Sequence, residues 1–326
     1  MKTIEKLKPH EGKLRSHLAM EIWSARYLYL MLLPFFLWLI LFEYVPMAGN
    51  ILAFKEFKAT EGIWGSPWVG MKHFRRIFAT PAAVKAIINT VVLSFQRIIF
   101  EFPVPILLAL ITTEMRGRQV KKVYQTILTF PHFLSWVVVS AILISLFSEA
   151  GAINSILTAM GLDSIPFLSD SGFFRGMLFA THNWKEMGWA SIIYMATISS
   201  IDPGLYEAAE IDGASKLRQI WHVTLPALLP LISMRLILKV GSIMNAGFGQ
   251  ILTMRNSVVA SDVQILDTFI YDKTFNALPN YGFSTAVGLF KGVINFALLM
   301  IANQVVGRVT GEKMWSFEKR KKGRRR

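Results

Sequence analysis

The stretch SIDPGLYEAAEIDGASKLRQIWHVTLP, residues 200–226, sets the interpretation of the whole chain. It is less apolar than a membrane span and less biased than a disordered segment, and it predicts two short helices hinged on Gly213. Asp202 is expected to cap the first helix. Pro203 suits the first position of that helix, because a proline there gives up only an N–H that would be unpaired anyway.

The second helix of this stretch follows a period of 3.6 residues. One face is expected to carry the i, i+3, i+4 and i+7 positions: Leu217, Ile220, Trp221 and Thr224. Leu225 and Pro226 are expected to end the helix. The residues alone leave two interpretations open: an amphipathic hairpin that lies on a membrane surface without a partner, or a hairpin that docks on another protein.

A motif in this stretch bears on that choice. The spacing E-A-A, three residues, G, nine residues, V, one residue, L-P resembles the EAA loop of ABC importer permeases, with valine where isoleucine is usual. In that family the loop is a cytoplasmic coupling helix in a cleft of the ATPase subunit, and the resemblance implies the same role here. The implied ATPase-coupling residues are Glu207, Ala208, Ala209, Asp212, Gly213, Leu217, Val223, Leu225 and Pro226. Of these, Glu207 is expected to contact the cleft and Gly213 to allow the sharp turn.

Composition places the rest of the chain in a membrane. Of the 326 residues, 53% are hydrophobic and 17% are charged, and the mean hydropathy is +0.43, which is typical of membrane proteins. The chain has no cysteine, and its six histidines show no metal-ligand spacing, so no disulfide and no metal site are expected. The net charge of +14 is concentrated at the two ends, where contact with anionic membrane lipid explains it better than nucleic-acid binding does.

The apolar runs predict an all-α, polytopic membrane protein with about six transmembrane helices and a cytoplasmic coupling-helix hairpin. The expected spans are residues 27–47, 84–112, 123–147, 173–198, 227–252 and 282–307. The chain then divides into a basic N-terminal segment (1–26), a transmembrane permease domain (27–307) with the coupling loop at 200–226, and a basic tail (308–326). With both termini in the cytoplasm, the inner segments hold 21 Lys and Arg residues, far more than the outer ones, as the positive-inside rule requires.

The family resemblance extends from the first span to Trp315. Four segments resemble maltose-type permeases that import complex oligosaccharides and polysaccharides: FLSWVVVSAIL from Phe133, GAINSIL from Gly151, DVQILDTFIY from Asp262 and GLFKGVINFALLMIANQV from Gly288. Within that group the nearest match is one permease subunit of an alginate-type importer from a Gram-negative bacterium. The resemblance implies a multi-pass protein of the bacterial inner (cytoplasmic) membrane. It also implies a second homologous permease subunit, two ATPase subunits and a periplasmic or lipid-anchored solute-binding protein as partners.

Catalytic machinery is not expected in this chain. The sequence has no Gly-x-x-x-x-Gly-Lys-Ser/Thr loop, and no other glycine cluster precedes a lysine and a hydroxyl residue to hold nucleotide phosphates. The chain is therefore predicted to be a transport subunit and not an enzyme, and to bind no cofactor itself. ATP and Mg are expected in the partner ATPase subunits.

Polar residues within the spans are the candidates for a saccharide pathway, because a charge at mid-bilayer costs about 2.5 to 3.5 kcal/mol and is expected to face a cavity or a partner. The predicted pathway residues are Trp184, Lys185, Trp189, Lys239, Ser242, Asn245, Lys291 and Asn295. A tryptophan would stack on a sugar ring, while Lys239 and Asn245 would bond hydroxyls or carboxylates. A lysine-rich interior suits an acidic polysaccharide such as alginate.

Other interpretations of these polar residues stay open. Arg97 and Glu101 form an i, i+4 pair that can satisfy itself, and Arg235 can reach the membrane surface. An ion-coupled secondary transporter would use buried carboxylates, for which Glu101 and Glu186 are candidates. That alternative leaves the hairpin without a role, and no internal repeat supports it. A membrane anchor without a transport path would leave the polar residues unexplained.

Overall fold

The computed structural model of the chain describes residue 20 and residues 23–275 and 279–310. Within this part of the chain the protein is helical and has no strand; one isolated antiparallel bridge joins Lys55 to Trp68. The predicted all-α class is therefore confirmed. The predicted basic terminal segments, 1–26 and 308–326, lie largely outside the described residues.

The first membrane span is one helical run of four pieces. These are α2 (Arg26–Leu39), the π-helical turn η1 (Ile40–Tyr44), α3 (Val45–Met47) and the 3-10 helix η2 (Ala48–Phe54). The π turn precedes Pro46, which has no N–H and whose ring crowds the preceding turn, so a wider turn accommodates it. The span therefore continues past its proline.

The remaining helices follow in chain order. They are α4 (Gly62–Gly65), α5 (Lys72–Ala79), α6 (Pro81–Glu101), α7 (Pro103–Glu114), α8 (Arg118–Thr129), η3 (Phe130–Phe133), α9 (Trp136–Phe147), α10 (Ala152–Ala159), α11 (Ser171–Ser199), α12 (Pro203–Ile211), α13 (Lys216–Gln219), η4 (Ile220–Thr224), α14 (Leu225–Gly241), α15 (Phe248–Met254), α16 (Ala260–Val263), α17 (Leu266–Phe275) and α18 (Tyr281–Thr310).

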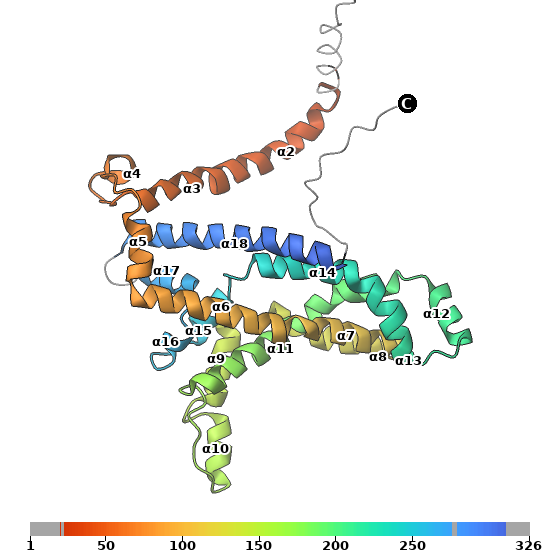
Figure 1. Cartoon of the computed structure of the whole chain (residues 1–326). Coiled ribbons are helices and arrows are strands. Elements are labelled where there is room, and N and C mark those ends of the chain that lie inside the picture. Colours follow the sequence, from red (N-terminus) through yellow and green to blue (C-terminus); the bar gives the residue numbers. More distant parts are fainter. Residues whose placement is uncertain (1–19, 21–22, 276–278, 311–326) are drawn as a thin grey trace, which may run out of the picture.

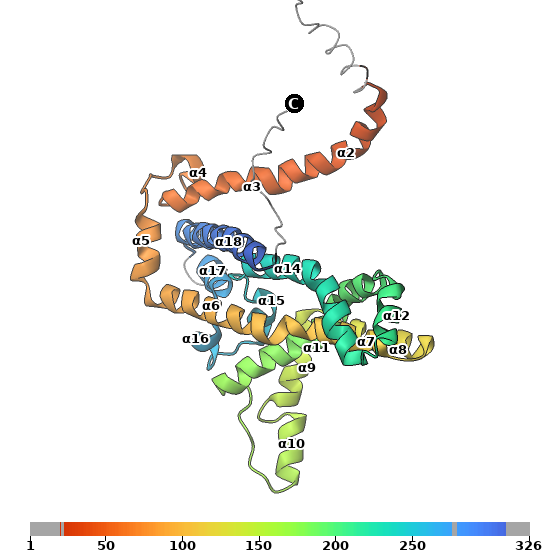
Figure 2. The ribbon, with the colours of Figure 1, turned by 45° about the vertical axis from the view of Figure 1, so that its right-hand side comes forward.

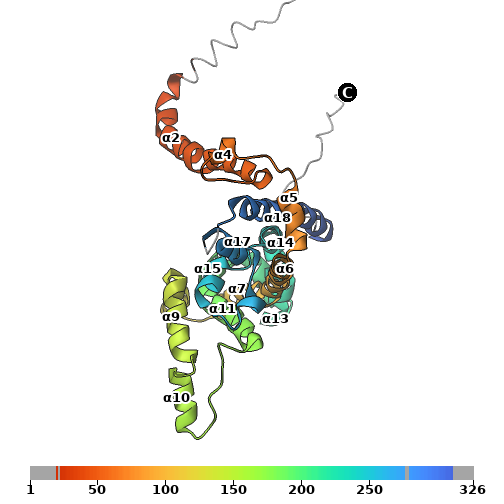
Figure 3. The same cartoon turned by 90° about the vertical axis from the view of Figure 1, so that its left-hand side faces the viewer.

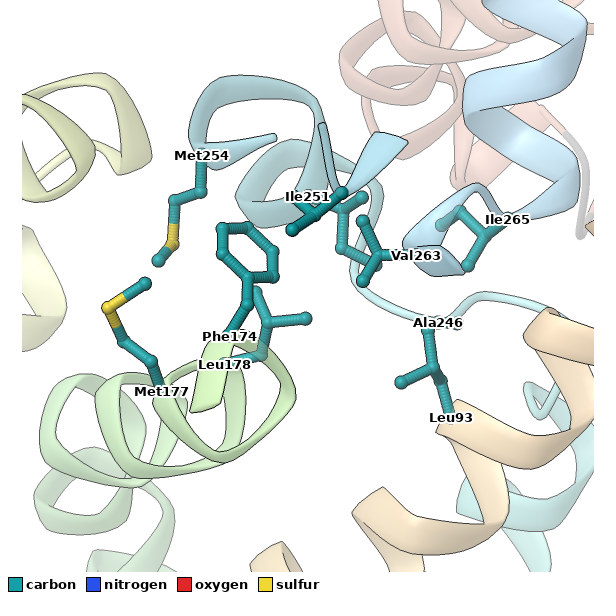
Figure 4. Packing of buried hydrophobic residues seen from close by; sticks show 10 residues of the cluster. Leu93, Phe174, Met177, Leu178, Ala246, Ile251, Met254, Val263 and Ile265 are labelled. Atoms are coloured by element: carbon teal, nitrogen blue, oxygen red, sulfur yellow. The ribbon is translucent and has the colours of Figure 1, made fainter. Parts of the chain in front are cut away.

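The core forms where these helices cross. Helices α14 and α18 lie side by side, and α11 packs on α7 (Figure 1). One buried cluster joins α11, α15, α16 and α6; Figure 4 shows Phe174 and Leu178 of α11 pointing toward Ile251, and Met177 facing Met254. Since α15 and α16 follow the end of α14 at Gly241, this cluster fixes the segment after the fifth span against α11.

Length and apolar composition identify five candidate spans among the described residues. They are Arg26–Phe54, Pro81–Glu114, Trp136–Ala159, Lys216–Gly241 and Tyr281–Arg308. The remaining predicted span, the fourth (173–198), lies inside α11, which has 29 residues. Its polar run from His182 to Glu186 makes it less apolar than the other spans, and His182, Asn183 and Glu186 of this run line the pocket described below.

Two predicted boundaries are wrong. The third span does not run from 123 to 147, because α8 ends before Pro131 and a new helix, α9, begins at Trp136 after a cap by Ser135, whose Oγ accepts the Val138 N–H at 3.3 Å. The fifth span does not run from 227 to 252 either. It begins at Lys216, and α14 ends at Gly241, where residues 242–247 leave the helix.

The helical elements spread in three directions from the core. Helices α12 and α13 lie at the end of the bundle opposite α4 and α5 (Figure 2). Helices α9 and α10 form an arm that points away from the bundle, and α2 stands apart on the far side (Figure 3). None of the first span's apolar window is buried, whereas 17 to 22% of the other four windows is.

Candidate functional site

The first arm of the hairpin forms as its local sequence predicts. Asp202 Oδ1 accepts a hydrogen bond from the Gly204 N–H at 2.9 Å, and Pro203 is the first residue of α12. The cap and the proline together start the helix at one defined residue. Both predictions are confirmed.

The turn after α12 depends on a glycine. Gly213 has a φ of +74°, a conformation that other residues adopt only with strain. The Ala214 N–H bonds the Ala209 carbonyl at 2.9 Å across this turn, which closes the end of α12. The predicted hinge at Gly213 is therefore confirmed.

The second arm does not end where the sequence predicts. Helix α13, the π turn η4 and α14 form one continuous run from Lys216 to Gly241, so the expected end at Leu225 and Pro226 is wrong. Leu225 donates its N–H to the Ile220 carbonyl, five residues back, and this wider turn lets Pro226 enter the helix without breaking it. The hairpin thus continues directly into the fifth span.

The predicted single face of the second arm is also split. Thr224 is buried and Ile220 is half-buried, while Leu217 and Trp221 are exposed. The π turn and the packing of Ile220 on α7 and α11 side chains turn one pair inward and leave the other pair outside. The hairpin therefore has an apolar outer surface that nothing in the described chain covers.

Polar contacts hold the two arms together. The Tyr206 hydroxyl lies 3.0 Å from Thr224 Oγ1, and Lys216 Nζ lies 2.7 Å from Glu210 Oε1. The Lys216 ammonium bonded to Glu210 lowers the pKa of that carboxyl. These contacts join α12 and the second arm into one unit.

The predicted coupling residues lie mostly on the outside of this unit. The exposed ones are Glu207, Ala208, Asp212, Gly213, Leu217 and Pro226, and the half-buried ones are Ala209, Val223 and Leu225. Beside them, the Ile211 side chain is 87% exposed. Exposed apolar patches of this kind often mark a site of contact with a partner protein or a membrane. The surface has the composition of a docking site.

A polar pocket of about 370 Å³ lies between α6, α7, α11 and α14. Its lining includes Glu101, His182, Glu186, Trp189 and Lys239. Polar side chains at this depth need a cavity or partners to stay within a membrane. The pocket is therefore the place where spans two, four and five can present polar groups to a solute.

A buried network lies behind this pocket. Arg97 Nη1 donates to Glu101 Oε1 at 2.9 Å, and Arg97 Nη2 donates to Gln250 Oε1 at 2.6 Å. Gln250 Nε2 in turn donates to the Leu178 carbonyl and to Thr181 Oγ1, both at 2.8 Å. The network joins α6, α15 and α11, and it compensates two buried charges with each other.

A second polar group borders the pocket on α11. His132 Nδ1 lies 2.7 Å from Glu186 Oε2, and the His132 ring stacks on Trp189 with 4.6 Å between ring centres. Lys185 Nζ donates to the His132 carbonyl at 2.7 Å and to Glu186 Oε1 at 2.9 Å. These bonds fix the Trp189 ring at the rim of the pocket.

The predicted pathway residues fall into separate places. Trp189, Lys239 and Ser242 line the polar pocket. Lys185 is buried beneath it, and Trp184 lies on an apolar groove between α9 and α11. The other three are elsewhere: Lys291 pairs with Asp267 at 2.5 Å, Asn295 Oδ1 accepts the Met244 N–H at 3.0 Å, and Asn245 is exposed in the turn after α14. That any of the eight touches a saccharide stays a prediction.

Several polar pocket residues are missing from the eight predicted pathway residues, among them His182, Asn183, Tyr194 and Arg235. Arg235 precedes Lys239 by one helical turn of α14. The i, i+4 spacing was a usable signal. Arg235 was instead expected to extend to the membrane surface, because its span was expected to begin at 227 rather than at 216.

Comparison with known proteins identifies this arrangement. Residues 103–311 match the family model of the binding-protein-dependent transport system inner membrane component. The chain belongs to this family.

Several relatives of this permease are saccharide transport permeases. It is 41% identical over 292 residues to the polygalacturonan/rhamnogalacturonan transport system permease protein YteP of Bacillus subtilis, covering 89% of this chain and 91% of that one. It is 38% identical to protein LplB of the same organism, with the same coverage. The crystal structure of a bacterial ABC transporter involved in the import of the acidic polysaccharide alginate matches with a TM-score of 0.83 and 35% identity, covering 90% of this chain and 99% of that one.

These matches confirm the predicted family and function. The protein is a sugar ABC importer permease subunit, a transport component with an all-α, polytopic membrane fold. A second crystal structure, of the alginate transporter in complex with an alginate pentasaccharide-bound periplasmic protein, matches with a TM-score of 0.82 and 34% identity, covering 90% of this chain and 98% of that one. Membership of this family excludes the ion-coupled secondary transporter. Glu101 and Glu186, the carboxylates considered for that role, are paired with cations of the same chain.

Proposed function

We propose that this permease transmits ATP-driven movement from the hairpin at residues 200–226 to the polar pocket through one continuous helix. The observation that carries the proposal is the run Lys216–Gly241, which begins in the hairpin and ends at the pocket lining. Arg235 and Lys239 lie on the pocket end of this run. Movement of the hairpin therefore moves both cations.

The partner on the hairpin is an ATPase subunit. Glu207 and the exposed apolar residues Ile211, Leu217 and Trp221 provide a mixed surface that an ATPase cleft would cover. Two ATPase subunits bind and hydrolyse ATP with Mg below a pair of permeases, of which this chain is one and a homologous chain the other. Closure of the ATPases rotates the two halves, and the pocket opens toward the outside.

The solute is an oligosaccharide from an acidic polysaccharide. A solute-binding protein, periplasmic or lipid-anchored, delivers it to the outer side; the solved alginate transporter, which resembles this chain, is in complex with a pentasaccharide-bound periplasmic protein. Within the pocket, Glu101 and Glu186 have cationic partners, whereas Arg235 has no carboxylate within ion-pair distance in the described chain. Arg235 and Lys239 are thus the cations available to a uronate, and Trp189 offers its ring to the sugar.

The permease lies in the bacterial cytoplasmic membrane with both termini in the cytoplasm. This orientation puts the hairpin inside, where ATP is available, and α4 and α5 at the outer face (Figure 1). It agrees with the excess of Lys and Arg in the segments assigned to the cytoplasm.

The experiment is ATP hydrolysis by the purified four-subunit complex in lipid, with and without loaded binding protein. Gly213→Val strains the turn of the hairpin because valine rarely adopts a φ of +74°, and we expect loss of the stimulation by loaded binding protein while the protein still inserts. Gly161→Val is the matched control, since Gly161 also has a positive φ, of +78°, and neither glycine has an atom within 4 Å of an added Cβ.

Two outcomes decide the test. Retained hydrolysis and sugar uptake in Gly161→Val, with both lost in Gly213→Val, supports coupling through the hairpin. Normal uptake by Gly213→Val would falsify it. A set of loaded binding proteins carrying neutral or uronic-acid oligosaccharides identifies the solute in the same assay.

A further inference from the structure

The two carboxylate oxygens of Glu101 have different surroundings. Oε1 accepts a hydrogen bond from Arg97 Nη1 at 2.9 Å. Oε2 has no hydrogen-bond partner among the described residues; it lies 3.4 Å from His182 Nδ1 and 3.6 Å from Lys239 Nζ. The side chain is only 3% exposed, so this oxygen forgoes water as well. A buried, unsatisfied carboxylate oxygen is costly and calls for an explanation.

Arg97 is held too firmly to turn and donate a hydrogen bond to Glu101 Oε2. Its other nitrogen, Nη2, is bonded to Gln250, and the guanidinium lies against Gly247, where an added Cβ would come within 2.8 Å of Nη2. Arg97 therefore fixes Glu101 in one orientation. In that orientation Oε2 points at the polar pocket, whose lining includes Glu101, His182 and Lys239.

Lys239 is held far more loosely. Its side chain is 35% exposed in the pocket, and its one ion pair within the described chain is the 3.6 Å approach to Glu101. That distance is longer than a hydrogen bond, so the ammonium keeps its capacity to bond an incoming acceptor. Glu101 thus holds Lys239 at the pocket without fully satisfying it.

We propose that Glu101 is a positioning residue that sets how strongly this pocket prefers acidic over neutral saccharides, by competing with the solute carboxylate for Lys239. The inference rests on the proposed passage of a saccharide through this pocket. A uronate carboxylate bonds the Lys239 ammonium in the place that Glu101 Oε2 holds in the empty pocket. A neutral sugar leaves the Glu101–Lys239 contact intact.

The exchange has a functional advantage over a free lysine. A carboxylate bound to an uncontested, desolvated ammonium would be held tightly and released slowly. With Glu101 as internal competitor, the solute replaces one ion pair with another, and its departure restores the first. The pocket therefore recognises charge and still releases the solute.

The test measures binding to the lipid-embedded complex without binding protein, using an oligogalacturonate and its methyl ester, which lacks the negative charges and carries one methyl group on each carboxyl. The readout is the ratio of the two dissociation constants, ester over acid. Glu101→Gln keeps the side-chain shape, and we expect it to raise the ratio roughly fivefold by freeing Lys239. Lys239→Met is expected to lower the ratio roughly tenfold. Neither change should alter the constant for the ester by more than about twofold.

The double variant separates competition from simple repulsion. If Glu101 acts through Lys239, then Glu101→Gln in the Lys239→Met background changes the ratio by less than about twofold. A gain of the same size in both backgrounds, or equal effects on acid and ester, overturns the inference. If Glu101→Gln fails to assemble because Arg97 is left buried and unpaired, the charge-balanced variant Arg97→Gln/Glu101→Gln takes its place with the same expected gain.

The design also separates this inference from the proposed function. Wild-type complex that binds neither sugar refutes the pocket as part of the pathway. Wild-type complex that binds both, with a ratio that none of the variants moves, leaves the pathway standing and refutes the role of Glu101 alone.

Discussion

At the scale of single residues, close approach between helices depends on Gly188. A Cβ built at this position would come within 2.0 Å of the Leu128 carbonyl oxygen, so α11 and α8 meet backbone to backbone. The same contact places Trp189 beside His132 at the pocket rim. Small residues at helix crossings serve this purpose in membrane proteins.

Gly188→Ala is therefore expected to destabilise the protein by about 1 to 3 kcal/mol, the usual cost of overpacking. Gly176→Ala in the same helix is the control, because nothing lies within 4 Å of its added Cβ. That change is expected to be neutral or slightly stabilising, since alanine favours a helix over glycine by up to about 1 kcal/mol. Thermal unfolding followed by tryptophan fluorescence compares the two. Equal melting temperatures would contradict the close contact.

Residue-level predictions from sequence succeeded where the signal was local. Asp202 and Gly213 act through their immediate neighbours, so their types and positions predict the cap and the turn. Asn295 and Gly247 act at a distance: Asn295 Oδ1 accepts the Met244 N–H in the turn after α14, and Gly247 makes room for Arg97. The residues that neighbour Asn295 and Gly247 in the sequence do not predict these contacts. The placement of pathway residues therefore needed the structure.

At the scale of elements, the errors in span boundaries have one cause. The predicted span 123–147 runs through Pro131 without a break. The second helix of the hairpin, in contrast, is predicted to end at Pro226. The structure shows the reverse at both sites: the chain breaks near Pro131, while a π turn carries the helix through Pro226. Neighbouring elements decide such cases, and a single sequence does not reveal them.

The short helix α16 is anchored to α6 and α11 by the carboxylate of Asp262. Asp262 accepts from Lys85 Nζ on α6 at 2.9 Å and from Ser171 Oγ on α11 at 2.7 Å. Bonds from Ser171, Lys85 and Ser261 lower the pKa of Asp262 to about 2, from an ordinary value of 3.8. The stabilisation is fully present above pH 3.8 and is lost only as the pH falls through about 2. The contact is therefore insensitive to pH between 5 and 8.

Asp262→Asn is expected to loosen α16 by about 1 kcal/mol, allowing for solvent screening of this half-exposed pair. The rate of hydrogen exchange at residues 259–263, relative to the wild type at the same pH, should rise by the same factor at pH 6 and at pH 8. Asp163→Asn serves as the control, because Asp163 is exposed and shows no ion pair within the described chain. Unchanged exchange at 259–263 in the Asp262 variant would show that apolar packing alone holds α16.

At the scale of the whole molecule, the proposed orientation makes a sharp prediction. The chain has no cysteine, so single cysteines can be introduced without a background. A maleimide that cannot cross membranes should label Glu61→Cys and Asp163→Cys on spheroplasts, and should label Arg218→Cys only after permeabilisation. All three positions are exposed. The opposite pattern would place the hairpin outside and refute coupling to a cytoplasmic ATPase.

In the proposed mechanism, the continuous helix from Lys216 to Gly241 acts as a rigid lever between the hairpin and the pocket. From Lys216 to Lys239 it measures roughly 35 Å at 1.5 Å per residue, so a tilt of about 3° displaces one end by roughly 2 Å relative to the other. A displacement of that size exceeds the tolerance of any hydrogen bond. Under the proposed coupling, a small movement of the hairpin by the ATPases is therefore enough to make or break contacts around Lys239, and the stiffness of the helix sets how much of that movement reaches the pocket.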